Sequence, residues 1–240
     1  MIEVRELYKS FDTKEVLKGI DMDINDNETL VILGPSGQGK TVLIKSMIRL
    51  IPADSGRVLF DGADIYSMKK KTLHGLQKQI SFVFQNSALF DFLDVQENLR
   101  LYLKMHTKQS NDMIMEQVWE AIRFVGLEDD VLGKFPEELS GGMKKRVAIA
   151  RAMIQKPKYI FYDEPTTGLD KGNAENVSRL IGMLKSEIAA TSVIVTHDIK
   201  LMQEVADRVV LLKNGRVDFT GSKDQISSGT LEELYQQEQV

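Results

Sequence analysis

The sequence contains no cysteine. Without a thiol, the chain forms no disulfide, binds no metal through a thiolate and has no cysteine nucleophile, and this composition fits a reducing compartment. An excess of basic charge is also missing, since 31 Lys and Arg stand against 35 Asp and Glu and the net charge at pH 7 is -4. We therefore expect no nucleic acid partner held by a global basic field.

Long apolar runs are absent too. The runs LVIL, YIFY and VVLL are far shorter than the roughly 20 residues that a helix needs to cross a bilayer. The N-terminal stretch MIEVRELYKSF alternates apolar and polar residues and lacks the apolar core of a secretory signal. We expect a soluble chain that can dock on a membrane protein, and 240 residues with 42% apolar content suffice for a sizeable core.

The periodicity of apolar residues divides the chain into regions. Strands are predicted at 2–7, 19–24, 29–34, 57–62, 80–85, 158–163 and 191–197, and a hairpin at 208–221 turns at Asn214-Gly215. Helices are predicted from Gly39 to just before Pro52, at about 70–78 and 174–189, and in a polar tail from Ser222. Residues 86–156 are predicted to form a helical insertion, with helices in DVQENLRLYLKM, SNDMIMEQVWEAIRFVG and GGMKKRVAIARAMIQ and no strand between them. The alternating β/α segment after residue 157 indicates an α/β fold with a parallel sheet.

The first glycine cluster, GPSGQGKT, follows an apolar strand and opens a helix. Gly34, Gly39, Lys40 and Thr41 match G-x-x-x-x-G-K-[ST], whose backbone N–H groups and helix N-terminus bind phosphates. Lys40 is expected to reach the β- and γ-phosphates and Thr41 to ligate Mg²⁺. The residues expected to contact the nucleotide are Gly34, Pro35, Ser36, Gly37, Gln38, Gly39, Lys40, Thr41 and Val42.

Hydrolysis needs further groups at the ends of other strands. The stretch YIFYDE places Asp163 to hold Mg²⁺ and Glu164 to polarise the attacking water. His197 ends SVIVTH, at the edge where ligands gather in α/β sheets, and is expected to orient that water and contact the γ-phosphate. Gln85 ends ISFVFQ, so it could touch the metal or the water. We therefore expect Glu164, His197 and Gln85 to be catalytic and Thr41, Gln85 and Asp163 to form the Mg²⁺ site.

A second glycine cluster, LSGGMKKR, opens another helix. Ser140 is a plausible N-cap, and Gly141 and Gly142 permit close approach to an anion. A second phosphate cradle is redundant for one nucleotide unless it serves another copy. Local reasoning leaves open the alternative of a capped helix with a basic surface.

In order and spacing, these motifs resemble the Walker A, Q-loop, signature, Walker B, D-loop and H-loop of ABC transporter ATPases. The resemblance implies a single domain over 1–240. A RecA-like core and an N-terminal antiparallel β portion would span 1–85 and 157–221, a helical subdomain would span 86–156, and a helical tail 222–240. It also implies a head-to-tail homodimer around two ATP, with Ser140, Gly141 and Gly142 on the partner's γ-phosphate. Asp170 would link the two sites. Phe11 would stack on adenine, with Tyr8 as its rival.

A finer resemblance concerns the cargo. GGMKKRVAIARA and FQNSALFDFLDVQENL, with LKMHT after it, resemble segments of ATPases of MCE-associated, Mla-type lipid transporters. That likeness implies phospholipid transport, permease subunits docking near residues 86–105, an MCE-domain substrate-binding protein, and a cytoplasmic position on the inner face of the cell membrane.

Several alternatives remain open. An ABC ATPase could serve an amino acid, lipoprotein-release or cell-division system. A soluble ABC ATPase of DNA repair or translation usually has a long coiled-coil insertion or a second ATPase domain, and neither fits in 240 residues. A P-loop kinase gives no role to the second glycine cluster.

Overall fold

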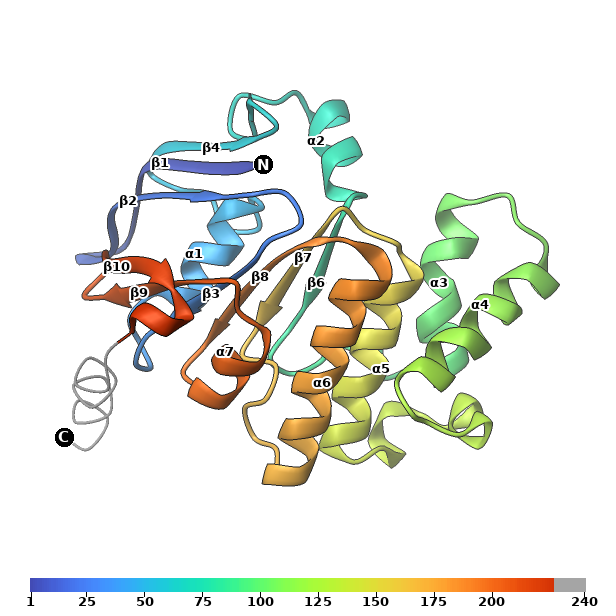
Figure 1. Ribbon diagram of the computed structural model, residues 1–240. Helices are drawn as coiled ribbons and strands as arrows, with labels where there is room; N and C mark the ends of the chain where they lie inside the picture. The colour runs from blue at the N-terminus through green and yellow to red at the C-terminus, as the bar shows by residue number, and fades with distance from the viewer. Residues whose placement is uncertain (227–240) are drawn as a thin grey trace.

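Two β-sheets lie side by side in the computed structural model, which describes residues 1–226 (Figure 1). The smaller sheet is antiparallel, in the order β2-β1-β4-β5. The larger sheet has the order β10-β9-β3-β8-β7-β6 and is parallel except for the β10–β9 pair. The strands span β1 (Ile2–Phe11), β2 (Lys14–Ile24), β3 (Thr29–Leu33), β4 (Ser55–Phe60), β5 (Ala63–Asp64), β6 (Ile80–Val83), β7 (Tyr159–Asp163), β8 (Thr191–Thr196), β9 (Arg208–Lys213) and β10 (Arg216–Ser222).

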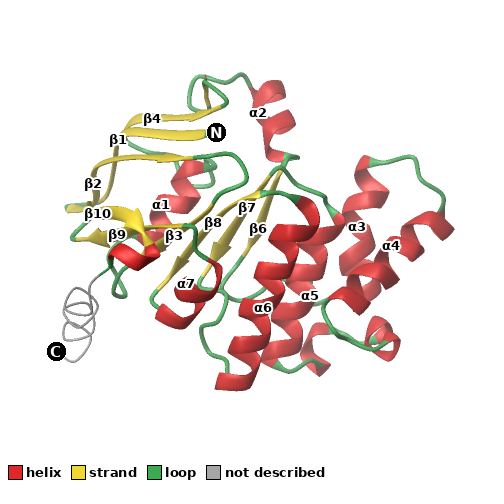
Figure 2. Cartoon of the chain, viewed as in Figure 1, coloured by secondary structure: helices red, strands yellow, loops and turns green. Residues whose placement is uncertain are grey.

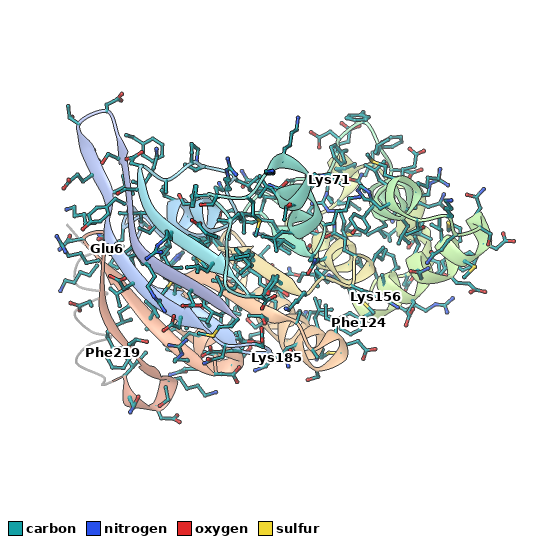
Figure 3. The ribbon with its side chains drawn as sticks, turned by 90° about the horizontal axis from the view of Figure 1, so that it is seen from above. Glu6, Lys71, Phe124, Lys156, Lys185 and Phe219 are labelled. Atoms are coloured by element: carbon teal, nitrogen blue, oxygen red, sulfur yellow. The ribbon has the colours of Figure 1, made fainter. Side chains whose placement is uncertain are left out.

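The helices are α1 (Lys40–Met47), α2 (Lys70–Gln77), α3 (Val95–His106), α4 (Asn111–Phe124), α5 (Gly141–Ile154), α6 (Lys171–Ile188) and α7 (Ile199–Val205), with short 3₁₀ turns at Asp129–Gly133, Pro136–Glu138 and Lys223–Gln225. Helices α3 to α7 pack on the face of the larger sheet turned away from the smaller sheet, whereas α1 lies between the two sheets (Figure 2). Residues 86–156 contain no strand, and α3 and α4 project beyond the sheet. Seen from above, the strands with Glu6 and Phe219 lie at the end opposite these helices (Figure 3).

Some predicted boundaries differ from the structure. Helix α1 ends at Met47 and not before Pro52, because Arg49 has a left-handed φ of 58° and the N–H of Leu50 turns back to the carbonyl of Lys45. Helix α6 begins at Lys171 because Asp170 caps it. Helix α7 was not predicted. Ser222 ends β10 and caps the 3₁₀ turn Lys223–Gln225, and the predicted helical tail beyond residue 226 lies outside the described residues.

The parallel strands bring four predicted site residues to one edge. In register, Leu33 of β3 pairs with Thr196 of β8, and Asp163 of β7 pairs with Val195. Strand β6 runs parallel beside β7. The residues that follow these strand ends are Gly34, Glu164, Gln85 and His197. Parallel sheets expose ligand sites at this carboxyl edge.

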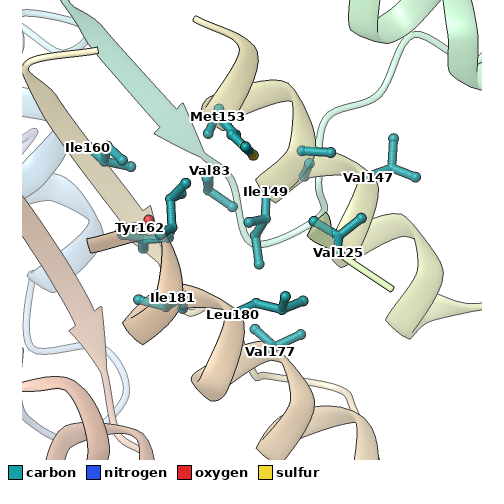
Figure 4. Packing of buried hydrophobic residues seen from close by; sticks show 14 of the residues in the cluster. Val83, Val125, Val147, Ile149, Met153, Ile160, Tyr162, Val177, Leu180 and Ile181 are labelled. Atoms are coloured by element: carbon teal, nitrogen blue, oxygen red, sulfur yellow. The ribbon is translucent and has the colours of Figure 1, made fainter. Parts of the chain in front are cut away.

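Two apolar cores hold the sheets and helices in place. The larger core packs α3, α4, α5 and α6 on one face of the β10–β6 sheet, through Val83, Ile149, Tyr162 and Leu180 among others (Figure 4). The second core fills the space between the two sheets around α1, with Ile20, Leu43 and Phe161 buried. The segment from β7 to Glu164 is thus packed on both faces. Within the described residues, every helix is too short or too polar to cross a bilayer.

Candidate functional site

The loop between β3 and α1 curls around the N-terminus of the helix. Gly37 and Gly39 have φ angles of 77° and 96°, which glycine adopts without the strain of a side chain. Gly39 is the N-cap of α1, and no side chain caps this end or places an acid in its first turn. The first N–H groups of a helix lack partners within it, so this end is suited to an anion.

Lys40 points back into this loop. The residue is 5% exposed. Its ammonium donates to the carbonyl oxygens of Gly34 at 2.7 Å and Pro35 at 3.0 Å, and it forms an ion pair with Glu164 at 3.1 Å. A buried ammonium with these partners has a fixed position at the mouth of the phosphate loop.

Thr41 at the start of α1 and Asp163 at the end of β7 are hydrogen-bonded to each other. The Thr41 hydroxyl donates to Oδ1 of Asp163 at 2.6 Å, and Lys45, which was not predicted, lies 3.7 Å from Oδ2. Asp163 is 2% exposed. A hydroxyl and a carboxylate are hard oxygen donors of the kind that Mg²⁺ prefers, so the predicted pair fits the ion. We see no cluster of three or more acid or imidazole side chains among the described residues, so a metal here would draw its remaining ligands from phosphate and water.

Glu164 is buried between Lys40 and His197. Its Oε1 faces Lys40 and its Oε2 lies 3.0 Å from Nδ1 of His197 and accepts a hydrogen bond from Thr167 at 3.1 Å. Burial alone would raise the pKa of Glu164, but the hydrogen bond from His197 and the charge of Lys40 outweigh it and lower this pKa to about 2. Glu164 is therefore ionised at neutral pH.

A cavity of about 450 Å³ joins these residues, within the range of small-molecule sites. The predicted residues that line it are Phe11, Ser36, Gly37, Gly39, Lys40, Thr41, Val42, Gln85, Glu164 and His197. Val16 and Thr167 also line it and were not predicted. No pattern in the sequence marks Val16. It reaches the cavity because it packs on the phosphate loop, where a Cβ on Gly39 would lie 2.9 Å from Val16 Cγ1.

The structure distinguishes Phe11 from its rival Tyr8. Phe11 lines the cavity and is 44% exposed. Tyr8 does not line it, and its phenol covers Gly19, where a Cβ would lie 2.7 Å from the hydroxyl oxygen. Of these two aromatic side chains, Phe11 is thus the one that a nucleotide's adenine ring in this cavity could stack on.

Other predicted residues lie outside the cavity. Pro35 contributes its carbonyl to Lys40, and the Gln38 side chain accepts a hydrogen bond from the N–H of Asn214 at 2.6 Å. Ser140 accepts from the N–H of Met143 at 3.3 Å as the N-cap of α5, as predicted. Asp170 caps α6 through Asn173.

Helices α5 and α6 begin side by side. A Cβ on Gly142 would lie 2.5 Å from Oδ1 of Asn173, so a larger residue there would have to displace the Asn173 side chain. Gly141 and Asp170 are exposed next to the contact. The second glycine cluster therefore lies on the surface, separate from the cavity that holds Lys40 and Glu164.

Comparison with known proteins gives one family. The ABC transporter family model matches residues 17–167. The chain is 39% identical to the probable ribonucleotide transport ATP-binding protein mkl of Mycobacterium leprae, over 93% of this chain and 64% of that protein. It is 37% identical to the sulfate/thiosulfate import ATP-binding protein CysA of Pseudomonas putida, over 94% of this chain and 68% of that protein. The chain thus spans about two thirds of the length of these relatives.

A solved structure agrees with the fold. The dimeric ATP-binding cassette MJ0796, in a post-hydrolysis state bound to ADP and Pi, superposes with a TM-score of 0.85 at 30% identity. The match covers 93% of this chain and 99% of that one. The predicted antiparallel β portion, core sheet and helical segment are confirmed together as one architecture.

Proposed function

This chain belongs to the ABC transporter family, and on that premise we propose that it is the ATP-hydrolysing subunit of a transporter. The observation that supports this most is the cavity lined by the phosphate loop, Thr41 and the buried Glu164, together with Asp163, which lies outside the lining and accepts a hydrogen bond from Thr41. Binding, metal ligation and activation of water each have a residue there.

In the proposed mechanism Lys40 and the N–H groups of residues 36–40 bind the phosphates of ATP. Thr41 and Asp163, assisted by Gln85, would hold Mg²⁺, which would supply positive charge to the phosphate oxygens when bound. A triphosphate offers Lys40 oxygen partners other than Glu164. The Glu164 carboxylate is then available to polarise the attacking water, while His197 holds its other oxygen and orients the water.

We propose a second copy of the chain as the partner at the second glycine cluster. Ser140 and Gly141 are exposed and Gly142 is buried beside them at the N-terminus of α5, and in a head-to-tail dimer this helix end would bind the γ-phosphate held by the other copy. Asp170 lies next to this surface, where it would join the two sites. The dimeric cassette MJ0796 supports this arrangement by its similarity.

We place the membrane subunits over a groove between β6 and α3. It has a volume of about 460 Å³, and Phe84, Phe90, Tyr102 and Met105 contribute apolar surface to it. Phe90 is 43% and Met105 68% exposed. Exposed apolar side chains in a groove are typical of a protein-binding surface. The subunit would thus lie on the cytoplasmic face of the membrane, bound to its permease.

For the cargo we propose a phospholipid or similar lipid, with an MCE-domain protein as a further partner. The support is the likeness of residues 141–152 and 84–107 to Mla-type ATPases. The relatives named above are a ribonucleotide and a sulfate transporter, so a small polar anion is the competing cargo.

Replacement of Glu164 by Gln tests the ATPase proposal. The amide cannot accept the proton of water, so we expect hydrolysis to fall at least about 100-fold while ATP binding persists and a dimer accumulates. Light scattering after gel filtration in saturating ATP and Mg²⁺ measures this. Glu120→Gln, an exposed acid on α4, is the matched control. A Glu164→Gln protein that stays monomeric, even with its membrane partner, contradicts the proposal.

The cargo needs a separate experiment. Mass spectrometry of the complex purified with its native membrane subunits should detect phospholipid bound in a defined ratio. Transport of a ribonucleotide or sulfate by reconstituted complex, with no bound lipid, would overturn the lipid proposal and leave the ATPase proposal intact.

A further inference from the structure

Lys145 on α5 is a buried lysine that the mechanism above does not use. It is 5% exposed, although lysine is rarely buried without a partner of opposite charge. Its ammonium donates to two backbone carbonyls, those of Gln85 at 2.5 Å and Glu164 at 3.2 Å. No carboxylate of the described residues lies within ion-pair distance of it.

The two carbonyls belong to the ends of two different strands. Gln85 follows β6 and Glu164 follows β7. Lys145 itself lies one turn beyond Gly142, in the helix that begins with the second glycine cluster. The Lys145 side chain therefore connects Glu164 and Gln85 to α5. This is the helix that we place against the nucleotide of the other copy.

Glu164 needs such a restraint more than an ordinary residue does. Its φ is 47°, in the left-handed region that costs a residue with a side chain about 1–2 kcal/mol. Its N–H donates to the carbonyl of Val195 at 2.9 Å, and its carbonyl accepts from Lys145 at 3.2 Å and from the N–H of Thr167 at 3.3 Å. The backbone N–H and carbonyl of Glu164 are thus both hydrogen-bonded, which restrains the direction in which the carboxylate leaves the backbone.

Arg151, a second cationic residue of α5, binds the loop that follows β6 and contains Gln85. Arg151 donates to the carbonyl of Ser87 at 2.9 Å and of Ala88 at 2.8 Å, in residues whose φ angles are also positive. Arg151 lines the groove assigned to the membrane subunits. The backbone from 85 to 88 is therefore tied to α5 at both ends.

We propose that Lys145 is a positioning residue that sets the orientation of Glu164 according to the position of α5. Its bond to the Glu164 carbonyl holds the base toward the cavity, and its bond to Gln85 makes this hold depend on the loop that Arg151 connects to the groove. A shift of α5, caused by a second copy or by the membrane subunits, changes the alignment of the base without changing the phosphate loop. This inference rests on the ATPase function proposed above.

Lys145→Met tests it, because methionine keeps the length and apolar stem but donates no hydrogen bond. In the purified full chain we expect kcat for ATP hydrolysis to fall by about 10- to 100-fold, as for loss of a charge-assisted hydrogen bond. The dissociation constant of a fluorescent ATP analogue should stay within about twofold, because the phosphate loop is untouched. Lys145→Arg, which keeps the donors, should recover most of kcat.

Lys144→Met is the matched control, since it makes the same change one residue earlier, at a half-buried position. It should keep wild-type kcat. Lys145→Leu provides a second variant without a donor should the methionine destabilise the fold, which thermal unfolding reports. Unchanged kcat in Lys145→Met or Lys145→Leu overturns the inference, as does equal loss in Lys144→Met or a parallel loss of nucleotide binding. An inactive wild type would instead refute the proposed ATPase.

Discussion

Nδ1 of His197 lies 3.0 Å from the carboxylate of Glu164, on the side away from Lys40. His197 follows β8 and Glu164 follows β7, so two neighbouring parallel strands bring this imidazole and this carboxylate together. The carboxylate that we propose as the base is thereby fixed in direction, and Lys40 compensates its charge before any substrate binds.

This pairing makes stability depend on pH. The pKa of Glu164 is lowered from 4.5 to about 2, so its contribution to the free energy of unfolding is complete above about pH 5 and is lost as the pH falls toward 2. Glu164→Gln lacks this dependence. The difference in unfolding free energy between wild type and Glu164→Gln should therefore shrink by about 1 kcal/mol between pH 7 and pH 3.5 in urea titrations. A difference that stays constant or grows would refute the assignment.

Replacement of Phe11 by Ala should weaken nucleotide binding. Loss of stacking on a base costs about 1–3 kcal/mol, so we expect the dissociation constant of ATP to rise at least about fivefold, measured by calorimetry. Tyr8→Ala is the control, because Tyr8 covers Gly19 and lies outside the cavity. If Tyr8→Ala raises the dissociation constant of ATP more than Phe11→Ala does, Tyr8 and not Phe11 stacks on the adenine.

Gly34 and Gly75 should respond to alanine in opposite directions. A Cβ on Gly34 would lie 2.4 Å from the carbonyl oxygen of Leu212, so Gly34→Ala should lower the free energy of unfolding by about 1–3 kcal/mol. Gly75 lies inside α2 with nothing within 4 Å of its Cβ position, so Gly75→Ala should raise it by up to about 1 kcal/mol. Chemical unfolding measures both, and equal effects would show that the approach of β9 to the phosphate loop can relax.

An acidic change in the groove should uncouple the subunit from its membrane partner. Met105→Asp places a charge on an exposed apolar residue of the groove, which should reduce co-purification with the permease at least about tenfold because the desolvated charge has no partner. ATP affinity should not change. Met183→Asp is the matched control, because Met183 on α6 is 45% exposed and lies outside the groove. Co-purification with the permease should not change in this variant. If both variants lose the partner, the groove is not the docking site.

The sequence predicted the site best where one segment supplies both a strand end and its polar residue. Gly34, Glu164 and His197 could be placed together because parallel strands share a carboxyl edge. Thr167 escaped prediction because its hydroxyl reaches Glu164 only through the turn after β7. Lys145 lies 60 residues from Gln85, and no local pattern marks a side chain that crosses between two strand ends.

The fold was predicted less well at helix ends. The α1 pattern continues through Leu50, but the left-handed Arg49 ends the helix earlier. Helix α7 is only 7 residues long, and Asp198 caps it by accepting from two backbone N–H groups directly after His197, so the strand pattern concealed its start. Periodicity detects long elements, while caps and turns depend on single residues.

The contact between Gly142 and Asn173 also has an electrostatic consequence. It brings the N-termini of α5 and α6 together, and each helix end contributes a partial positive charge of about half an elementary charge. This face would attract the triphosphate of an approaching molecule over several ångströms, so the rate of association, more than the final affinity, should fall as ionic strength rises.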